Sequence, residues 1–170
     1  MRTKLIWVAA LCVFGSFGFM VWQKEAILRD GRTVYLELAP VDPRSLMQGD
    51  YMALNYALGQ SFRRWEGETD KLEAPPSGVM VIELDGHGAG KFVRLYKGEV
   101  LATNEQLLRF HHAQGRVVIG AESYFSQEGT ASNYARARYG ELKVAKDGTP
   151  LLVALCDENF ERKSAPLEAK

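Results

Sequence analysis

The sequence predicts a mainly β fold: an antiparallel sandwich or partly open barrel of about seven strands, preceded by one N-terminal transmembrane helix and accompanied by one or two short helices. Two observations support this prediction. An uncharged apolar run occupies residues 5–22. From residue 26 onward, apolar residues recur with period two, which is the periodicity of half-buried strands. Turn residues separate the alternating segments, so the strands are expected to pair largely as hairpins.

The composition is that of a single folded domain. The chain has 170 residues, of which 46% are hydrophobic and 25% are charged. These proportions exclude a disordered chain, and the negative mean hydropathy excludes a polytopic membrane protein. The formal net charge is zero, so nothing indicates a nucleic-acid partner. Two cysteines are too few for a disulfide-rich scaffold.

The apolar run at residues 5–22 is long enough to cross a bilayer. As a helix it would span roughly 27 Å, and Trp7 and Trp22 lie near its ends, where indole rings favour the headgroup level. A cleaved signal peptide has a shorter apolar stretch followed by a small-x-small site, whereas this run ends in Met20–Glu25. The sequence therefore predicts an uncleaved anchor over residues 1–24, which contacts the lipid bilayer through residues 5–22.

The charges around the anchor favour a cytoplasmic N-terminus. Arg2, Lys4 and the amino group precede the apolar run, and Lys24, Arg29 and Arg32 follow it, so the local count is nearly balanced. Because only a short tail precedes the apolar run and a long domain follows it, we expect the N-terminus in the cytoplasm and the domain on the other side of the membrane. We therefore expect a single-pass membrane protein with a cytoplasmic N-terminus and with its main domain outside the cytoplasm.

The expected extracytoplasmic domain occupies residues 25–160, and residues 161–170 are expected to form a flexible tail. The sequence Lys146-Asp147-Gly148 is a strong hairpin signal near the C-terminal end of the domain. Helices are expected at residues 130–139 and near residues 60–65. Strands are expected at residues 33–39, 51–58, 79–84, 91–96, 116–125, 141–145 and 149–155.

Motifs for metals and cofactors are weak. The three histidines, His87, His111 and His112, lack the paired spacing of a zinc site. The Gly-rich stretch at residues 86–90 is one residue short of a phosphate-binding loop and leads into an expected strand. We therefore expect neither a metal nor a cofactor.

The most structured local pattern surrounds a Gly-Asp-Tyr sequence. Gly49 allows a positive φ that turns the chain into the next strand, and Asp50 is suited to accept backbone N–H groups of the preceding loop. Leu54 and Tyr56 share one face of that strand, and Tyr51 is expected on the other face. The two tyrosines are therefore not expected to act together on one small substrate, and the pattern is interpreted as a turn plus strand that nucleates the fold.

These residues resemble the GDYXXLXY family of bacterial membrane-anchored proteins, which is named for this motif. Gly49, Asp50, Tyr51, Leu54 and Tyr56 fill every named position of the motif. The resemblance extends over about residues 30–155 and includes the N-terminal anchor. Its other structural or binding candidates lie in the preceding loop and in a second shared block: Asp42, Pro43, Arg44, Ser45, Tyr124, Phe125, Glu128 and Gly129.

The resemblance implies a partner rather than a reaction. The family has no established activity, and its members often occur beside, or joined to, multi-spanning membrane proteins. It therefore implies an accessory or interaction module that works with a multi-spanning membrane protein. The oligomeric state is left open.

Two alternatives to an accessory role remain. The chain is also similar to membrane-anchored signal peptidases, which have an N-terminal anchor, a β-rich outer domain and a serine ahead of a Gly-Asp-led strand. Here Ser45 is four residues before Gly49 rather than eight, and the block that supplies the general-base lysine has no counterpart. A serine without a positioned base is not activated. The alternatives are thus a Ser/Lys-type hydrolase and the binding of a small ligand in the β-domain.

Overall fold

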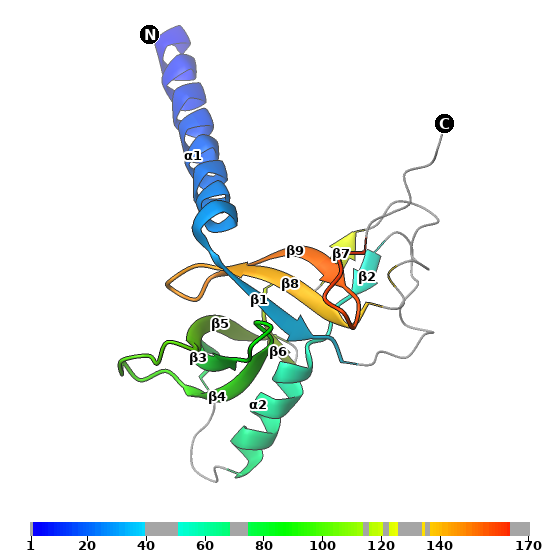
Figure 1. Ribbon diagram of the computed structural model, residues 1–170. Coiled ribbons are helices and arrows are strands. Elements are labelled where there is room, and N and C mark those ends of the chain that lie inside the picture. The colour runs from blue at the N-terminus through cyan, green and yellow to red at the C-terminus, as the bar shows by residue number, and fades with distance from the viewer. Residues whose placement is uncertain are drawn as a thin grey trace, which may run out of the picture.

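The computed structural model describes residues 2–39, 51–68, 75–113, 116–120, 123–125, 134 and 137–163 (Figure 1). These residues confirm the predicted fold class, because an apolar N-terminal helix leads into a mainly β domain with antiparallel sheets. The elements are α1 (Arg2–Asp30), β1 (Arg32–Glu37), β2 (Tyr51–Ala53), α2 (Ala57–Glu68), β3 (Ser77–Leu84), β4 (Gly90–Leu95), β5 (Glu105–Ala113), β6 (Arg116–Val118), β7 (Ser123–Phe125), β8 (Tyr139–Val144) and β9 (Pro150–Cys156).

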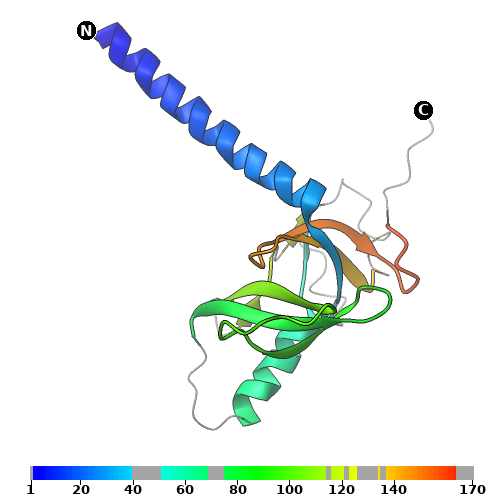
Figure 2. The ribbon, with the colours of Figure 1, turned by 60° about the vertical axis from the view of Figure 1, so that its left-hand side comes forward.

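Two sheets form the body of the head, by which we mean the part of the protein that follows α1. The first has three strands in the order β1-β8-β9, and the second has four strands in the order β4-β3-β5-β6. β2 and β7 form a separate two-stranded ribbon. Every pairing within these sheets is antiparallel. The two larger sheets lie one above the other, with α1 at the side of the three-stranded sheet and α2 at the side of the four-stranded sheet (Figure 2).

The core lies between these layers and continues under α2. Phe62 of α2 is fully buried, and its ring centroid lies 4.8 Å from that of Phe110 and 5.2 Å from that of Phe92. The strands contribute alternate residues to the same cluster, as period-two sequences do when one face of a sheet is buried. The largest of these fully buried strand residues are Leu36, Met80, Ile82, Leu108, Leu142 and Leu155.

Helix α1 projects from the head as one continuous element of 29 residues (Figures 1 and 2). Its segment Ile6–Asp30 is long and apolar enough to cross a membrane, and none of its most apolar window is buried by the rest of the chain. The helix continues from Trp22 to Asp30, roughly 12 Å further. Its last turns contact β8 and β9. The helix therefore holds the head close to the end of the apolar segment.

The predicted strand over residues 51–58 is wrong in its second half. β2 ends at Ala53, and α2 begins at Ala57. Leu58 and Phe62 are both buried and lie four residues apart, which places them on one face of a helix. The burial of this face in the core makes the segment a helix, although the preceding residues alternate as in a strand.

Other expected elements have mixed outcomes. The short helix expected near residues 60–65 is confirmed within α2, whereas β5 was not predicted. The strand expected at residues 116–125 is divided into β6 and β7. Of the helix expected at residues 130–139, Tyr134 is helical and Tyr139 begins β8; most of the remaining positions lie outside the described residues.

The hairpin between β8 and β9 is confirmed, and it depends on Gly148. This residue has a φ of 88°, and a Cβ atom there would lie 3.1 Å from the backbone nitrogen of Leu108 and 3.2 Å from that of Arg109. We expect Gly148→Ala to lower the free energy of unfolding by about 1–3 kcal/mol, because it adds a backbone contact to the strain of a positive φ. Urea titration of the full chain in detergent micelles measures this loss.

Gly98→Ala is the matched control for this prediction. Gly98 has a φ of 97°, but a Cβ atom there would have no neighbour within 4 Å. The control therefore carries only the conformational strain, about 1 kcal/mol. Equal losses for the two variants would show that the close approach of Gly148 to β5 has no energetic weight.

Candidate functional site

The structure brings the two sequence blocks that carry the motif candidates side by side. β2 and β7 pair antiparallel, with Tyr51 opposite Phe125 and Met52 opposite Tyr124 (Figure 1). The two blocks are separated by about seventy residues of sequence, so their pairing is a property of the fold. It indicates that the described strands of the motif and of the second block form one structural unit.

The second half of the motif enters the core. Leu54 and Tyr56 are buried, and Tyr56 forms an isolated antiparallel bridge with Leu38. The backbone nitrogen of Ala39 donates a hydrogen bond of 2.7 Å to the carbonyl oxygen of Asn55. Burial raises the pKa of the Tyr56 phenol, which therefore stays protonated in the folded protein. These contacts give Leu54 and Tyr56 an architectural role.

The remaining candidates are placed only in part. For Tyr51, Tyr124 and Phe125 the structure gives the backbone pairing. The Ser/Lys-type hydrolase alternative depends on Ser45 and stays a prediction, because that residue is not described. The candidates that lie outside the described residues are Asp42, Pro43, Arg44, Ser45, Gly49, Asp50, Glu128 and Gly129.

A small pocket lies beside the second half of the motif. It has a volume of about 130 Å³, which is about four times the volume of a water molecule in the liquid. α2 approaches β6 closely here, since a Cβ atom on Gly59 would lie 3.3 Å from the carbonyl oxygen of Val117. The residues that line the pocket are Ala39, Asn55, Gly59, Gln60, Arg63, Arg116 and Val117.

The polar groups of this pocket suit an anion. Arg63 comes from α2 and Arg116 from β6, and both side chains are exposed. Neither guanidinium forms an ion pair with any carboxylate among the described residues. The amides of Asn55 and Gln60 add hydrogen-bond donors. Guanidinium and amide groups are the donors that proteins commonly use to bind a carboxylate or a phosphate.

The comparison with known families covers this part of the chain. A family model described as GDYXXLXY protein matches residues 13–155. The chain belongs to the GDYXXLXY family. The matched range includes the β2–β7 ribbon and the pocket beside it. No curated protein and no solved structure matches the chain significantly.

The GDYXXLXY match ends at residue 155, and Phe160, in the segment that follows β9, packs against Tyr35 of β1 and Tyr139 of β8. Phe160 has a φ of 63° and packs its ring among three others. The ring centroids lie 4.6 Å from Tyr139, 4.9 Å from Tyr35 and 5.5 Å from His87. A positive φ at an aromatic residue is unfavourable, so these ring contacts offset a local strain.

An ion pair between a buried carboxylate of β8 and an exposed arginine joins the sheet to the same C-terminal segment. Glu141 is 4% exposed, and its carboxylate accepts hydrogen bonds from Arg162 at 2.6 and 2.8 Å. These bonds lower the pKa of Glu141. Burial raises the pKa of the neighbouring Cys156 to about 11, so Cys156 is a protonated thiol at neutral pH. This thiol is therefore unsuited to nucleophilic catalysis.

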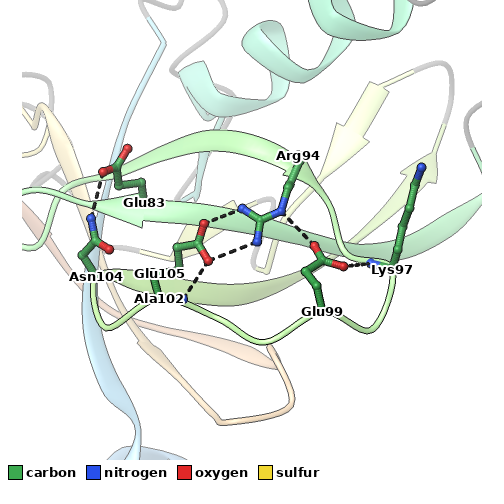
Figure 3. A network of polar contacts seen from close by, with 7 residues as sticks. All are labelled: Glu83, Arg94, Lys97, Glu99, Ala102, Asn104 and Glu105. Carbon is green, nitrogen blue, oxygen red and sulfur yellow. Dashed lines mark hydrogen bonds and ion pairs between the residues drawn. The ribbon is translucent and has the colours of Figure 1, made fainter.

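A second polar cluster fixes the connection between β4 and β5 (Figure 3). The Arg94 guanidinium contacts both carboxylate oxygens of Glu105 and donates from Nε to Glu99 at 2.8 Å. The backbone nitrogens of Ala102 and Lys97 donate to Glu105 and Glu99 at 2.9 and 2.8 Å. Both carboxylates accept hydrogen bonds from Arg94 and from backbone N–H groups of this connection. The cluster therefore has a structural role, and we call it the clamp.

The clamp makes stability depend on pH in acid. Hydrogen bonds from Arg94 and from the Ala102 N–H lower the pKa of Glu105 from 4.5 to about 2. Since the folded-state pKa is below the unfolded one, Glu105 contributes its full stabilisation above about pH 4.5 and loses it as the pH falls toward 2. Urea titrations of the unmodified chain and of Glu105→Gln should therefore differ most above pH 5 and converge toward pH 2.

Glu158→Gln is the control for this pH series. Glu158 is exposed and lies outside the clamp. Its substitution is a change at the surface, so it should alter the free energy of unfolding by no more than about 0.5 kcal/mol. A difference between Glu105→Gln and the unmodified chain that grows toward pH 2 would contradict the assignment of the clamp.

Proposed function

We propose that this GDYXXLXY protein is a single-pass, membrane-anchored accessory module that works with a multi-spanning membrane protein. The observation that carries the proposal is the surface of α1. Its apolar side chains are exposed on all sides, from Ile6 through Phe14 to Trp22. A helix that is apolar all round needs lipid or another transmembrane helix as its surroundings.

The proposed location is the bacterial cytoplasmic membrane, with the N-terminus inside and the head in the periplasm or outside the cell. Arg2 and Lys4 precede the apolar run and support a cytoplasmic N-terminus. The head then faces the compartment in which the extramembrane loops of a multi-spanning partner are within its reach.

The test is co-purification that depends on the anchor. The full chain is crosslinked in its native membrane, solubilised in mild detergent, and its companions are quantified by mass spectrometry. The control chain carries a leucine-alanine run of equal length in place of residues 5–22. The proposal predicts a multi-spanning protein in near-stoichiometric amount with the unmodified chain and at least about a tenfold loss with the control. Recovery of the unmodified chain alone would contradict the proposal.

A second candidate function is the binding of a small anion in the pocket beside the motif. It is favoured by one observation, which is that Arg63, Arg116, Asn55 and Gln60 all line the same pocket. The pocket is small, so the candidate ligand is an anionic group such as a phosphate or a carboxylate rather than a large molecule.

Thermal stability measures this binding. A ligand that binds only the folded state raises the melting temperature in a saturable way. We expect inorganic phosphate or acetate to raise the melting temperature of the unmodified chain, and the double variant Arg63→Gln/Arg116→Gln to lose most of the shift. Arg64→Gln is the matched control, since Arg64 is exposed on the same helix and does not line the pocket. An equal shift in all three proteins would refute a site at this pocket.

A further inference from the structure

A larger cleft lies where α1 meets the head. It has a volume of about 580 Å³ and is formed by Lys24 of α1 together with parts of β3, β5 and the first residues of β9. In Figure 2 the last turns of α1 lie beside β9, which agrees with their contact. Val79, Leu151 and Leu152 supply an apolar wall, and Arg109 supplies a second cation.

The position of this cleft along α1 places it at the membrane surface. Lys24 follows Trp22 by two residues, which is roughly 3 Å along the helix axis. Trp22 marks the expected hydrocarbon boundary, and the polar headgroup layer beyond it is about 5–8 Å deep. Lys24 and the mouth of the cleft therefore lie at the level of the lipid phosphates when α1 spans the bilayer.

The charge inside the cleft is positive. Lys24 and Arg109 both line it, and none of its described lining residues is a carboxylate. Asp147 holds Arg109 in place, with a carboxylate oxygen 3.3 Å from the guanidinium and a carbonyl oxygen that accepts from Nε at 3.1 Å. Asp147 offsets part of the Arg109 charge, whereas Lys24 forms no ion pair with a carboxylate in the described part of the chain.

This positive site is local. The chain beyond Trp22 has 19 basic and 21 acidic residues, so the head as a whole is not a basic surface. A generally basic head would be drawn to any anionic membrane, whereas a single cationic cleft with an apolar wall selects one molecule that has an anionic and an apolar part.

We propose that this cleft binds one phospholipid from the membrane leaflet that lies on the side of the head. The phosphodiester lies between Lys24 and Arg109, and the glycerol and upper acyl carbons lie against Val79, Leu151 and Leu152. A lipid with a net negative charge is preferred over a zwitterionic one, because both cations then act without a competing ammonium group. The site goes beyond the proposed accessory function, since it needs no protein partner.

The test measures lipid retention by native mass spectrometry. The full chain is released from detergent micelles titrated with phosphatidylglycerol, and the fraction of chains that carry one lipid is recorded. We expect a saturable single-lipid species for the unmodified chain and about a fivefold loss of affinity for each of Lys24→Gln and Arg109→Gln. Phosphatidylcholine in a parallel titration should be retained less.

Matched controls separate this site from lipid that merely surrounds the anchor. Lys91→Gln/Arg138→Gln removes two positive charges from residues that do not line the cleft and should leave retention unchanged. Near-UV circular dichroism reports whether the Arg109→Gln variant keeps its fold. Lys24 is exposed on α1, so Lys24→Gln tests the site without altering the packing of the head.

Three results would overturn the proposal. The first is equal lipid retention by the unmodified chain and by Lys24→Gln. The second is an equal loss with the Lys91→Gln/Arg138→Gln control, which would reduce the effect to net charge. The third is displacement of the lipid by millimolar inorganic phosphate, which would identify a site for free anions rather than for a phospholipid.

Discussion

Replacing Phe62 with alanine is expected to lower the free energy of unfolding by about 3–5 kcal/mol. Phe62 is fully buried where α2 meets the sheet, and its ring lies against those of Phe92, Phe110 and Trp65. Its removal leaves a cavity that these rings do not fill without breaking their own contacts. Urea titration of the full chain in detergent micelles, followed by near-UV circular dichroism, measures the loss.

Arg64→Ala is the control, because Arg64 lies on the same helix and is exposed. A surface substitution of this kind should change stability by no more than about 0.5 kcal/mol. A loss below about 1 kcal/mol for Phe62→Ala would mean that α2 does not close the core in the way described.

The second large effect concerns α1. Leu11 and Phe14 are both exposed near the middle of the apolar run. Placing an arginine at each position costs about 3 kcal/mol per residue in the centre of a membrane helix. The double variant Leu11→Arg/Phe14→Arg is therefore expected to leave alkaline-washed membranes almost completely, and a sedimentation assay after carbonate extraction measures this.

The conservative pair Leu11→Ile/Phe14→Leu serves as the control. It keeps both side chains apolar and should stay in the membrane pellet with the unmodified chain. Retention of the double arginine variant in the pellet would show that the head, rather than α1, holds the protein at the membrane.

Strong local patterns identified most of the fold. The β8–β9 hairpin follows from Asp147 and Gly148, which make a tight turn between two apolar strands. β5 was not predicted because its residue types do not alternate between apolar and polar as its burial does. The polar Gln106 is buried, and the apolar Leu107 is only half-buried. The Gln106 amide is accommodated because it donates to the carbonyl oxygens of Leu107 and Ala145, each at 3.2 Å.

The start of α2 shows where two periodicities compete. Leu54, Tyr56 and Leu58 alternate as in a strand, and the prediction extended that strand through all three. Leu58, Phe62 and Trp65 also repeat at helical spacing. Sequence alone does not rank the two patterns, because the deciding contact is the distant aromatic cluster of β4 and β5.

The candidate site was predicted less completely than the fold. The motif and the second block were identified from sequence, and the structure pairs Tyr51 with Phe125. Arg63 and Arg116 were missed, since a surface arginine on a helix and another at a strand start have no shared pattern until the fold brings them together. Phe160 was missed for the same reason, because its ring partners come from three other segments.

The most direct test asks whether the protein recovered from washed membranes still contains its N-terminal residues. Intact-mass and peptide analysis of that fraction should find residues 5–22 present in nearly every molecule, with the head still attached. Protein that begins after Trp22, or that is released by the wash, would contradict a permanent helical tether and the lipid-level position of the cleft.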